Sequence, residues 1–183
     1  MYLSHKLLFV GRFRLLASGT SNQLLETAVI PIDDEVGRLV GYGGRSLDGS
    51  QPRYKFPAGF AKSQVLFNLH RATATGQSTA IVVEGFFDCL KVHQAGFRSV
   101  VALMGSALSE RQRYLLVQRF HDVTLLLDGD RAGRQASIAI AARLAQDRPV
   151  RTVRLNENAQ PDQLSSQCLQ EILAQKGGSP QTR

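Results

Sequence analysis

Short apolar runs alternate with longer amphipathic segments from residue 80 onward. Four runs predict β-strands: 80–83, 99–102, 123–127 and 150–154. The first is rich in β-branched residues throughout, which is typical of a strand buried on both faces. Helical spacing predicts helices over 86–95, from 109 onward, over 131–146 and over about 164–174. Strands that alternate with helices indicate βαβ units, so we expect an α/β fold with a mainly parallel sheet flanked by helices.

The ends of these predicted helices carry capping signals. Gly96 follows the first helix, where glycine is a common C-terminal cap. Ser109 and Gln112 have the spacing of a capping box at the start of the second helix. Asp130 directly precedes the helix that begins at Arg131, and we expect it to cap that helix.

The residues before position 80 have a different pattern, with short strand-like pieces and many turn residues. Residues 27–32 and 37–42 flank an acidic turn and predict a β-hairpin. Gly41, Gly43 and Gly44 predict close backbone packing or a bulge, with a nucleotide-cradling loop as an alternative. The pattern divides the chain into an unassigned segment (1–26), a β-rich basic subdomain (27–78), an α/β domain (79–175) and a tail expected to fray (176–183). Within the second part, residues 48–52 have loop composition.

Composition narrows the classes of partner and of cellular location. The chain has 183 residues and a formal net charge of +7, a surplus that favours polyanionic partners such as nucleic acid. It has no run of ~18 apolar residues and no secretory signal, so we expect a cytoplasmic protein without a membrane span. Cys89 and Cys168 lie far apart and outside any CxxC pair, which predicts buried free thiols rather than a zinc site or a disulfide.

Acidic residues follow two of the predicted strands. Glu84 comes directly after the first strand, and Asp128 and Asp130 follow the third. The carboxyl ends of parallel strands form the ligand-binding edge of such sheets, and residues two apart in an extended segment point to the same side. A few carboxylates at one edge suit Mg²⁺, which keeps waters and also binds substrate phosphates. The alternative is that Asp128 is only an exposed strand end and Asp130 only a helix cap.

Other polar residues fall at the same edge. Asp88 lies one turn into the helix after Glu84, where it either complements the helix dipole or supports the metal site. Gly105 and Ser106 follow the second strand, in a turn whose backbone N–H groups can meet a phosphate. Arg131 and Arg134 follow the acidic pair and can bind phosphate or pair with the acids.

The motifs around these acids resemble the Toprim domain, a fold shared by bacterial DNA primases, topoisomerases and some nucleases. Residues 84–88 read EGFFD, residues 105–107 read GSA and residues 128–134 read DGDRAGR. These three motifs are most similar to those of the bacterial primase branch. Residues 30–45, 52–54 and 60–69 also resemble the β-rich segment that precedes Toprim in primase catalytic cores. The resemblance therefore covers about residues 28–165 and implies a Rossmann-like Toprim sheet after a small primase-core segment.

The resemblance implies roles for these residues. Glu84 would be a metal ligand or a general base on the 3′-hydroxyl, and Asp128 and Asp130 would bind Mg²⁺ (or Mn²⁺) with support from Asp88. The basic face that holds template DNA and nucleotides would contain Arg38, Arg45, Arg53 and Lys62. Where replicative primases carry a second acidic pair, this chain reads Gln160-Pro161-Asp162, so only Asp162 remains as a ligand.

These features predict an enzyme: a primase-like, Mg²⁺-dependent nucleotidyltransferase that acts on single-stranded DNA with NTPs. Its role would be RNA primer synthesis in DNA replication, for example that of a mobile element. The sequence resembles a catalytic-core fragment without the zinc-binding and helicase-binding domains, so a separate zinc-binding or helicase subunit is an expected partner. Two alternatives stay open: a Toprim nuclease that uses the same acids, and a non-catalytic nucleic-acid-binding accessory subunit.

Overall fold

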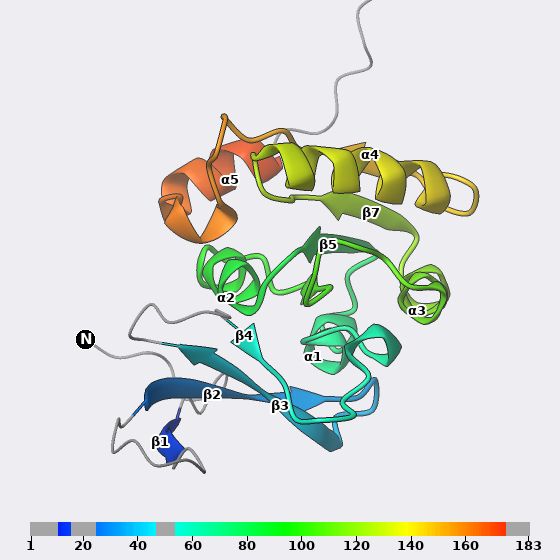
Figure 1. Ribbon diagram of the computed structural model, residues 1–183. Helices are drawn as coiled ribbons and strands as arrows, with labels where there is room; N and C mark the ends of the chain where they lie inside the picture. Colours follow the sequence, from blue (N-terminus) through cyan, green and yellow to red (C-terminus); the bar gives the residue numbers. More distant parts are fainter. Residues whose placement is uncertain (1–10, 16–24, 47–53, 175–183) are drawn as a thin grey trace, which may run out of the picture.

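Two β-sheets and five α-helices make up the part of the chain that the structure describes (Figure 1). The computed structural model describes residues 11–15, 25–46 and 54–174. Arg53, the predicted loop at 48–52, the predicted tail and most of the unassigned N-terminal segment lie outside the described residues. Within the described ranges, no helix combines the length and apolar character needed to cross a membrane.

The second half of the chain forms the predicted parallel sheet. Its strands are β5 (Thr79–Val83), β6 (Val100–Ala102), β7 (Asp122–Leu125) and β8 (Val150–Thr152). They pair in the order β6-β5-β7-β8, and each pairing is parallel. The connections that leave β5 and β7 therefore run to opposite sides, because β5 leads to β6 on one side and β7 leads to β8 on the other. Such a switch point opens a crevice at the carboxyl ends of the strands.

Four helices follow the parallel strands as the spacing predicted, whereas α1 precedes β5 and was not predicted. The helices are α1 (Leu69–Thr73), α2 (Phe86–Gln94), α3 (Glu110–Arg119), α4 (Arg131–Leu144) and α5 (Ser166–Ala174). Ser109 and Gln112 form the capping box of α3, and the Asp130 carboxylate accepts from Gly133 N–H at the start of α4. Gly96 adopts φ +105° after α2. Several helix boundaries differ from the predicted ones by one or two residues. Pro161–Gln163 forms a separate 3-10 turn, η2, before α5 begins.

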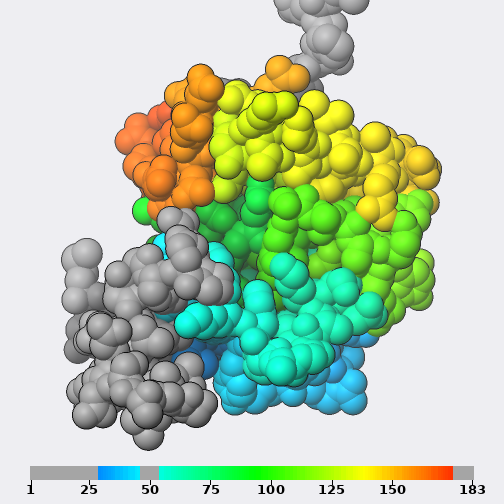
Figure 2. All heavy atoms as spheres, viewed as in Figure 1, coloured from blue at the N-terminus to red at the C-terminus, as the bar shows by residue number. Residues whose placement is uncertain are grey.

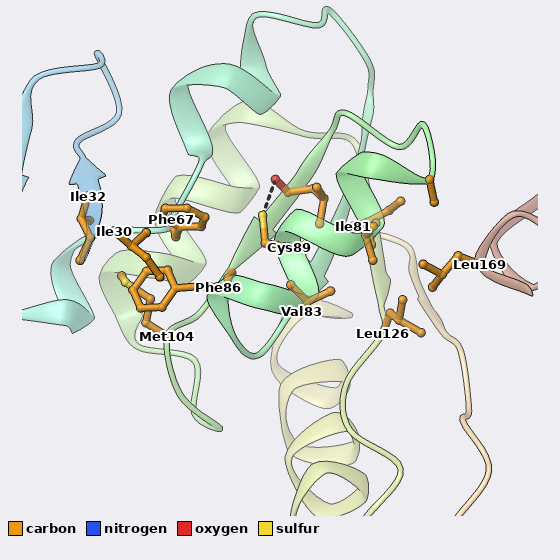
Figure 3. Packing of buried hydrophobic residues seen from close by; sticks show 14 of the residues in the cluster. Ile30, Ile32, Phe67, Ile81, Val83, Phe86, Cys89, Met104, Leu126 and Leu169 are labelled. Carbon is orange, nitrogen blue, oxygen red and sulfur yellow. Dashed lines mark hydrogen bonds between the residues drawn. The ribbon is translucent and has the colours of Figure 1, made fainter. Parts of the chain in front are cut away.

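Alternating residues of the parallel strands point into two hydrophobic clusters, one on each face of the sheet. Ile81 and Val83 face the cluster that includes α2 and α5, whereas Ala80 and Val82 face the cluster that includes α1, α3 and α4. Strands covered on both faces are mostly apolar, which explains the continuous apolar runs of β5 and β6, whereas β8 at the sheet edge is less buried. Figure 3 shows the first cluster, in which Phe86 lies among residues from both halves of the chain.

The first half of the described chain forms an antiparallel sheet. Its strands are β1 (Gly11–Leu15), β2 (Leu25–Asp33), β3 (Leu39–Ser46) and β4 (Tyr54–Lys55), in that order. The predicted hairpin is present, with longer strands than expected and a bulge between Ile32 and Asp33. β1 falls in the segment that sequence analysis left unassigned.

The glycines of β3 allow close packing. A Cβ on Gly41 would lie 2.6 Å from the Phe60 ring, and one on Gly43 would lie 2.7 Å from the Phe86 ring. Side chains at these positions would separate the antiparallel sheet from the residues it covers. Close packing was thus the right expectation, and the nucleotide-cradling loop was wrong because these glycines lie within a strand.

Ion pairs and apolar packing hold the antiparallel sheet against the rest of the molecule. Asp33 pairs with Arg71 of α1 (3.3 Å), and Glu35 pairs with Arg111 of α3 (2.7 Å). Ile30 of β2 is fully buried in the cluster drawn in Figure 3. In Figure 2 the cyan and teal residues after β4 lie between the blue hairpin and the green part of the chain. This contact brings side chains of the first half close to the edge of the parallel sheet.

Candidate active site

A hollow of about 340 Å³ lies at the carboxyl ends of the parallel strands. Both halves of the chain line it: Tyr54, Phe56 and Lys62 from the first half, and Glu84, Gly85, Phe86, Asp88, Met104, Gly105, Asp128, Gln160 and Asp162 from the second. Four of the five acids predicted for the site are in this wall. The hollow is therefore acidic on the side of the parallel sheet and contains a lysine on the other side.

Glu84 and Asp128 face each other across neighbouring strands. Glu84 follows the end of β5 and Asp128 follows β7, and the Glu84 carboxylate accepts from Asp128 N–H (3.2 Å). The start of α4 fits closely against both residues. A Cβ on Gly133 would lie 2.9 Å from Glu84 Oε1 and would overlap the Asp128 carbonyl oxygen. The absence of a side chain at Gly133 therefore lets the first turn of α4 pack directly against Glu84 and Asp128.

Asp88 is held by backbone hydrogen bonds to both of its oxygens. Oδ2 accepts from Gly85 N–H (2.9 Å) and Oδ1 accepts from Asp162 N–H (3.1 Å), and the side chain is buried. The first bond is part of the capping box of α2, a more specific contact than the dipole interaction that the sequence predicted for Asp88. The second bond ties α2 to η2. Asp88 thus fixes the position of Asp162 in the wall.

Asp162 and Asp128 receive further support from the loop before η2. Gln160 donates its side-chain N–H to Asp128 Oδ2 (2.8 Å). Gly129 N–H donates to the Ala159 carbonyl (2.8 Å), which joins the two segments that carry these side chains. Asp162 Oδ1 is buried and has no hydrogen-bond partner among the described residues. A buried, unpartnered carboxylate oxygen is a ready acceptor for a bound cation.

Burial and mutual repulsion make two of these acids weak. Burial, and then the negative charges of Asp128 and Asp130, raise the pKa of Glu84 to about 7. Burial, and then the charges of Asp128 and Asp162, raise the pKa of Asp88 to about 7. A cation beside the cluster would reverse this effect, because it favours the ionised carboxylates. Perturbed acids in a crevice of this kind indicate a functional site.

Lys62 reaches the opposite side of the hollow. A Cβ on Gly105 would lie 3.2 Å from Lys62 Nζ, so the ammonium group lies against the turn after β6. Met104 in the same turn has φ +60°, which is unusual for a residue with a side chain. The buried amide of Gln112 donates to the carbonyl oxygens of Leu103 (3.0 Å) and Val65 (2.9 Å). It therefore holds together the turn and the segment that carries Lys62.

The remaining predicted residues lie around the hollow or away from it. Asp130 caps α4 and is close enough to raise the pKa of Glu84, but it does not line the hollow. Arg131 is exposed in the first turn of α4, and Arg134 pairs with Glu157 (3.6 Å). Ser106 is exposed in the turn after β6.

Two of the basic residues predicted on β3 and its turn serve different contacts. Arg45 stacks on the Phe87 ring, with its guanidinium carbon 3.9 Å from the ring centroid, and donates to the Tyr54 hydroxyl (3.2 Å). It therefore lies next to a residue of the hollow and bridges the two halves of the chain. Arg38 is 79% exposed in the hairpin turn, where it pairs with Asp34 (2.8 Å). Arg38 is not part of the hollow, because the hairpin turn packs against α1 and α3 instead.

The donor set fits a divalent cation that keeps much of its own hydration. Within the described ranges, no group of three or more histidine, cysteine or acidic side chains is arranged to hold a metal ion by itself. Mg²⁺ is commonly bound by one or two carboxylates together with waters and substrate phosphates. Glu84 and Asp128 on neighbouring strands, with the buried oxygen of Asp162 nearby in the same wall, match that requirement.

The sequence did not predict a part in the site for several residues that shape it. Gly133 and Gln112 act through close packing and through a buried amide, and Phe56 lines the hollow. Gly133 follows the acidic pair Asp128 and Asp130 by about one helical turn, and this spacing could have indicated its close packing. For Gln112 the capping box explained the residue fully, so its contacts with distant carbonyl groups could not be foreseen.

Comparison with known proteins agrees with this arrangement. Residues 81–165 match the family described as Toprim-like. The chain is 41% identical over 127 residues to a DNA primase of Synechococcus elongatus, and the aligned region covers 65% of this chain and 18% of that protein. It is 40% identical over 146 residues to a DNA primase of Aquifex aeolicus, which covers 76% of this chain and 29% of that protein. The chain thus spans less than a third of the length of these relatives.

Solved structures show the same likeness in three dimensions. The Aquifex aeolicus primase structure with zinc-binding and RNA polymerase domains superposes with a TM-score of 0.75 at 34% identity, covering 90% of this chain and 44% of that one. A DnaG primase catalytic domain bound to single-stranded DNA gives a TM-score of 0.70 at 29% identity, covering 81% and 51%. Residues 81–165 therefore resemble a Toprim domain. More narrowly, the chain is similar to part of the catalytic core of DnaG-type bacterial primases.

Proposed function

We propose that this chain carries out Mg²⁺-dependent nucleotidyl transfer as part of a DnaG-type primase, making RNA primers on a DNA template. The observation that supports this most is the hollow itself, in which Glu84, Asp128 and Asp162 face Lys62. The relatives are DNA primases, and one similar structure is a primase catalytic domain bound to single-stranded DNA. Single-stranded DNA and NTPs are accordingly the proposed partners, with a separate zinc-binding or helicase subunit as a further one.

The proposed reaction joins the 3′-hydroxyl oxygen of the growing primer to the α-phosphorus of the incoming nucleotide. As that bond forms, the bond to the pyrophosphate leaving group breaks, and the hydroxyl proton is transferred to a base. Glu84 suits the role of base, since it lines the hollow and its carboxylate, ionised beside a bound cation, can accept that proton. When bound, Mg²⁺ acidifies the hydroxyl and neutralises charge that develops on the phosphates.

The other residues of the hollow would bind and orient. Asp128 and Asp162 would provide carboxylate oxygens for the cation, with Asp88 holding Asp162 in place. Asp130 would add negative charge behind Glu84. Lys62, together with the N–H groups of the turn at Gly105, would bind nucleotide phosphates opposite the acids.

Basic residues outside the hollow would extend the phosphate-binding surface. Arg131, Arg134 and Ser106 lie exposed near the acidic edge, where they would contact the nucleotide or the template. Arg45 would act at the rim through its contact with Tyr54. Arg38 would contribute to template binding at a distance from the acids, by neutralising backbone phosphates. Arg53, outside the described residues, is proposed for the same role.

Primer synthesis on single-stranded DNA tests the proposal. The protein is incubated with labelled NTPs and Mg²⁺, beside the Asp128→Ala/Asp130→Ala double variant and a sample treated with chelator. We expect short RNA products that require NTPs, Mg²⁺ and the two aspartates. Cleavage of nucleic acid without NTPs would instead establish a Toprim nuclease. Binding of DNA with no products, unchanged in the double variant, would establish a non-catalytic accessory subunit.

A further inference from the structure

Gln160 is an uncharged polar side chain of the acidic wall that contacts a proposed metal ligand, Asp128. It directly precedes η2, and its amide nitrogen lies 2.8 Å from Asp128 Oδ2. A carboxylate oxygen that accepts a hydrogen bond has less negative charge available for a cation. The contact thus involves one of the few oxygens that could bind the metal.

The contacts of this amide agree with its orientation. Its N–H group donates to Asp128 Oδ2 at 2.8 Å, and its carbonyl oxygen lies 3.5 Å from Gln163 Nε2. The position of Gln160 is also fixed, because Gly129 N–H donates to the Ala159 carbonyl at 2.8 Å. A Cβ on Gly129 would lie 3.1 Å from that same carbonyl oxygen, so the two segments are in close contact.

The same loop supplies a second donor to the acidic cluster. Asp162 N–H donates to Asp88 Oδ1 (3.1 Å), two residues after the Gln160 contact. Two N–H donors from one loop therefore offset part of the negative charge of Asp128 and Asp88. Such donors stabilise ionised carboxylates in a folded protein that has no bound cation.

We propose that Gln160 is a positioning residue that holds Asp128 Oδ2 and weakens divalent-cation binding, so that an acidic side chain at position 160 would create a tighter site. This inference rests on the proposed function, because it takes the acidic wall to be the metal site. The amide has a physical consequence in both states of the site. It compensates Asp128 when the cation is absent, and it competes with the cation for one oxygen when the cation is present.

Mn²⁺ binding measured by isothermal titration calorimetry tests this assignment without any reference to catalysis. Gln160→Glu replaces the donor by a carboxylate of the same length, and we expect it to bind Mn²⁺ at least ~10-fold more tightly than the unmodified chain. Asn158→Asp is the matched control, since it makes the same amide-to-acid change at an exposed position of the same loop. We expect this control to change the affinity less than about twofold, because surface charges are screened.

Two further variants separate the charge effect from a structural one. Adding Asp128→Asn to Gln160→Glu should abolish the gain, because the proposed pair of carboxylates is then lost. Gln160→Ala removes the donor without adding charge, and we expect roughly threefold tighter Mn²⁺ binding than in the unmodified chain. Gln160→Ala also keeps the assignment testable if Gln160→Glu fails to fold, which circular dichroism in chelator would reveal.

The outcomes are distinct. Equal affinities for the unmodified chain and Gln160→Glu, an equal gain in Asn158→Asp, weaker binding by Gln160→Ala, or no Mn²⁺ binding by any protein would each overturn the assignment. The expected order of affinities in a chain that makes no primers would keep the role of Gln160 and refute the proposed function. Primer synthesis without that order of affinities would do the reverse.

Discussion

The raised pKa of Glu84 predicts that this carboxylate destabilises the metal-free protein at alkaline pH. Its pKa rises from an ordinary 4.5 to about 7, chiefly because the side chain is partly buried. A change of this size corresponds to roughly 3 kcal/mol, and we reduce it to about 2 kcal/mol because solvent screens the exposed part of the side chain. The folded state holds the proton more tightly than the unfolded chain. Its stability therefore falls as the pH rises from 4.5, and the full penalty is present above about 7.

Glu84→Gln removes this charge and keeps the length of the side chain. Its amide oxygen can still accept from Asp128 N–H, so the local structure should persist. In chelator at about pH 8.5 we expect the variant to be about 2 kcal/mol more stable, which raises Tm by roughly 4–8 °C. At about pH 4 the difference should disappear, because Glu84 is then protonated in both the folded and unfolded states.

Thermal unfolding followed by circular dichroism across this pH range is the appropriate assay. Glu171→Gln is the matched control, since it removes the same charge from an exposed position on α5. Addition of Mg²⁺ at alkaline pH should narrow the difference between wild type and Glu84→Gln, because a cation neutralises the carboxylate but not the amide. A gain in stability that is independent of pH, or equal in both variants, would refute the electrostatic reasoning.

Three further changes probe the packing around the site. Gly133→Ala places a methyl group 2.9 Å from Glu84 Oε1, so it should lower primer synthesis at least ~10-fold. It should also lower the free energy of unfolding in urea by about 1–3 kcal/mol, and unchanged activity would contradict the close fit. Lys62→Ala should weaken DNA and nucleotide binding and reduce the slope of log binding constant against log salt concentration by about one. Lys91→Ala on α2 is the control and should have neither effect; equal effects of the two variants would show that Lys62 is not part of the site. Gln112→Ala leaves buried carbonyl groups without their donor and should lower the free energy of unfolding by about 1–3 kcal/mol, and a change below about 0.5 kcal/mol would show that water replaces the amide.

The sequence was most informative where local chemistry determines structure. The parallel strands are recognisable as apolar runs because both faces are buried, and Ser109 and Asp130 mark helix starts because their side chains accept nearby N–H groups. The proximity of Glu84 and Asp128 was predictable from the order of strands and helices, since the carboxyl ends of parallel strands meet at one edge.

Contacts between distant segments explain what the sequence could not show. Lys62 lies beside Gly105 only because the first half of the chain packs on the second. In the sequence, Gln160 stands where an acid is expected, but its hydrogen bond to Asp128 depends on how two loops pair. Arg38 was placed on a basic face although it pairs with Asp34 inside its own turn. A charge pattern in the sequence does not reveal which of its members are already paired.

Cleavage of the polypeptide by bound Fe²⁺ is the most direct test of the central claim, that the acids at this sheet edge bind the catalytic cation. Fe²⁺ that replaces Mg²⁺ generates hydroxyl radicals with ascorbate and peroxide, and these radicals cut the backbone next to the ion. The account predicts cuts near Glu84, Asp128 and Asp162, suppressed by excess Mg²⁺ and absent in Asp128→Ala/Asp130→Ala. Cuts elsewhere, or cuts at these positions that persist in the double variant, would contradict it.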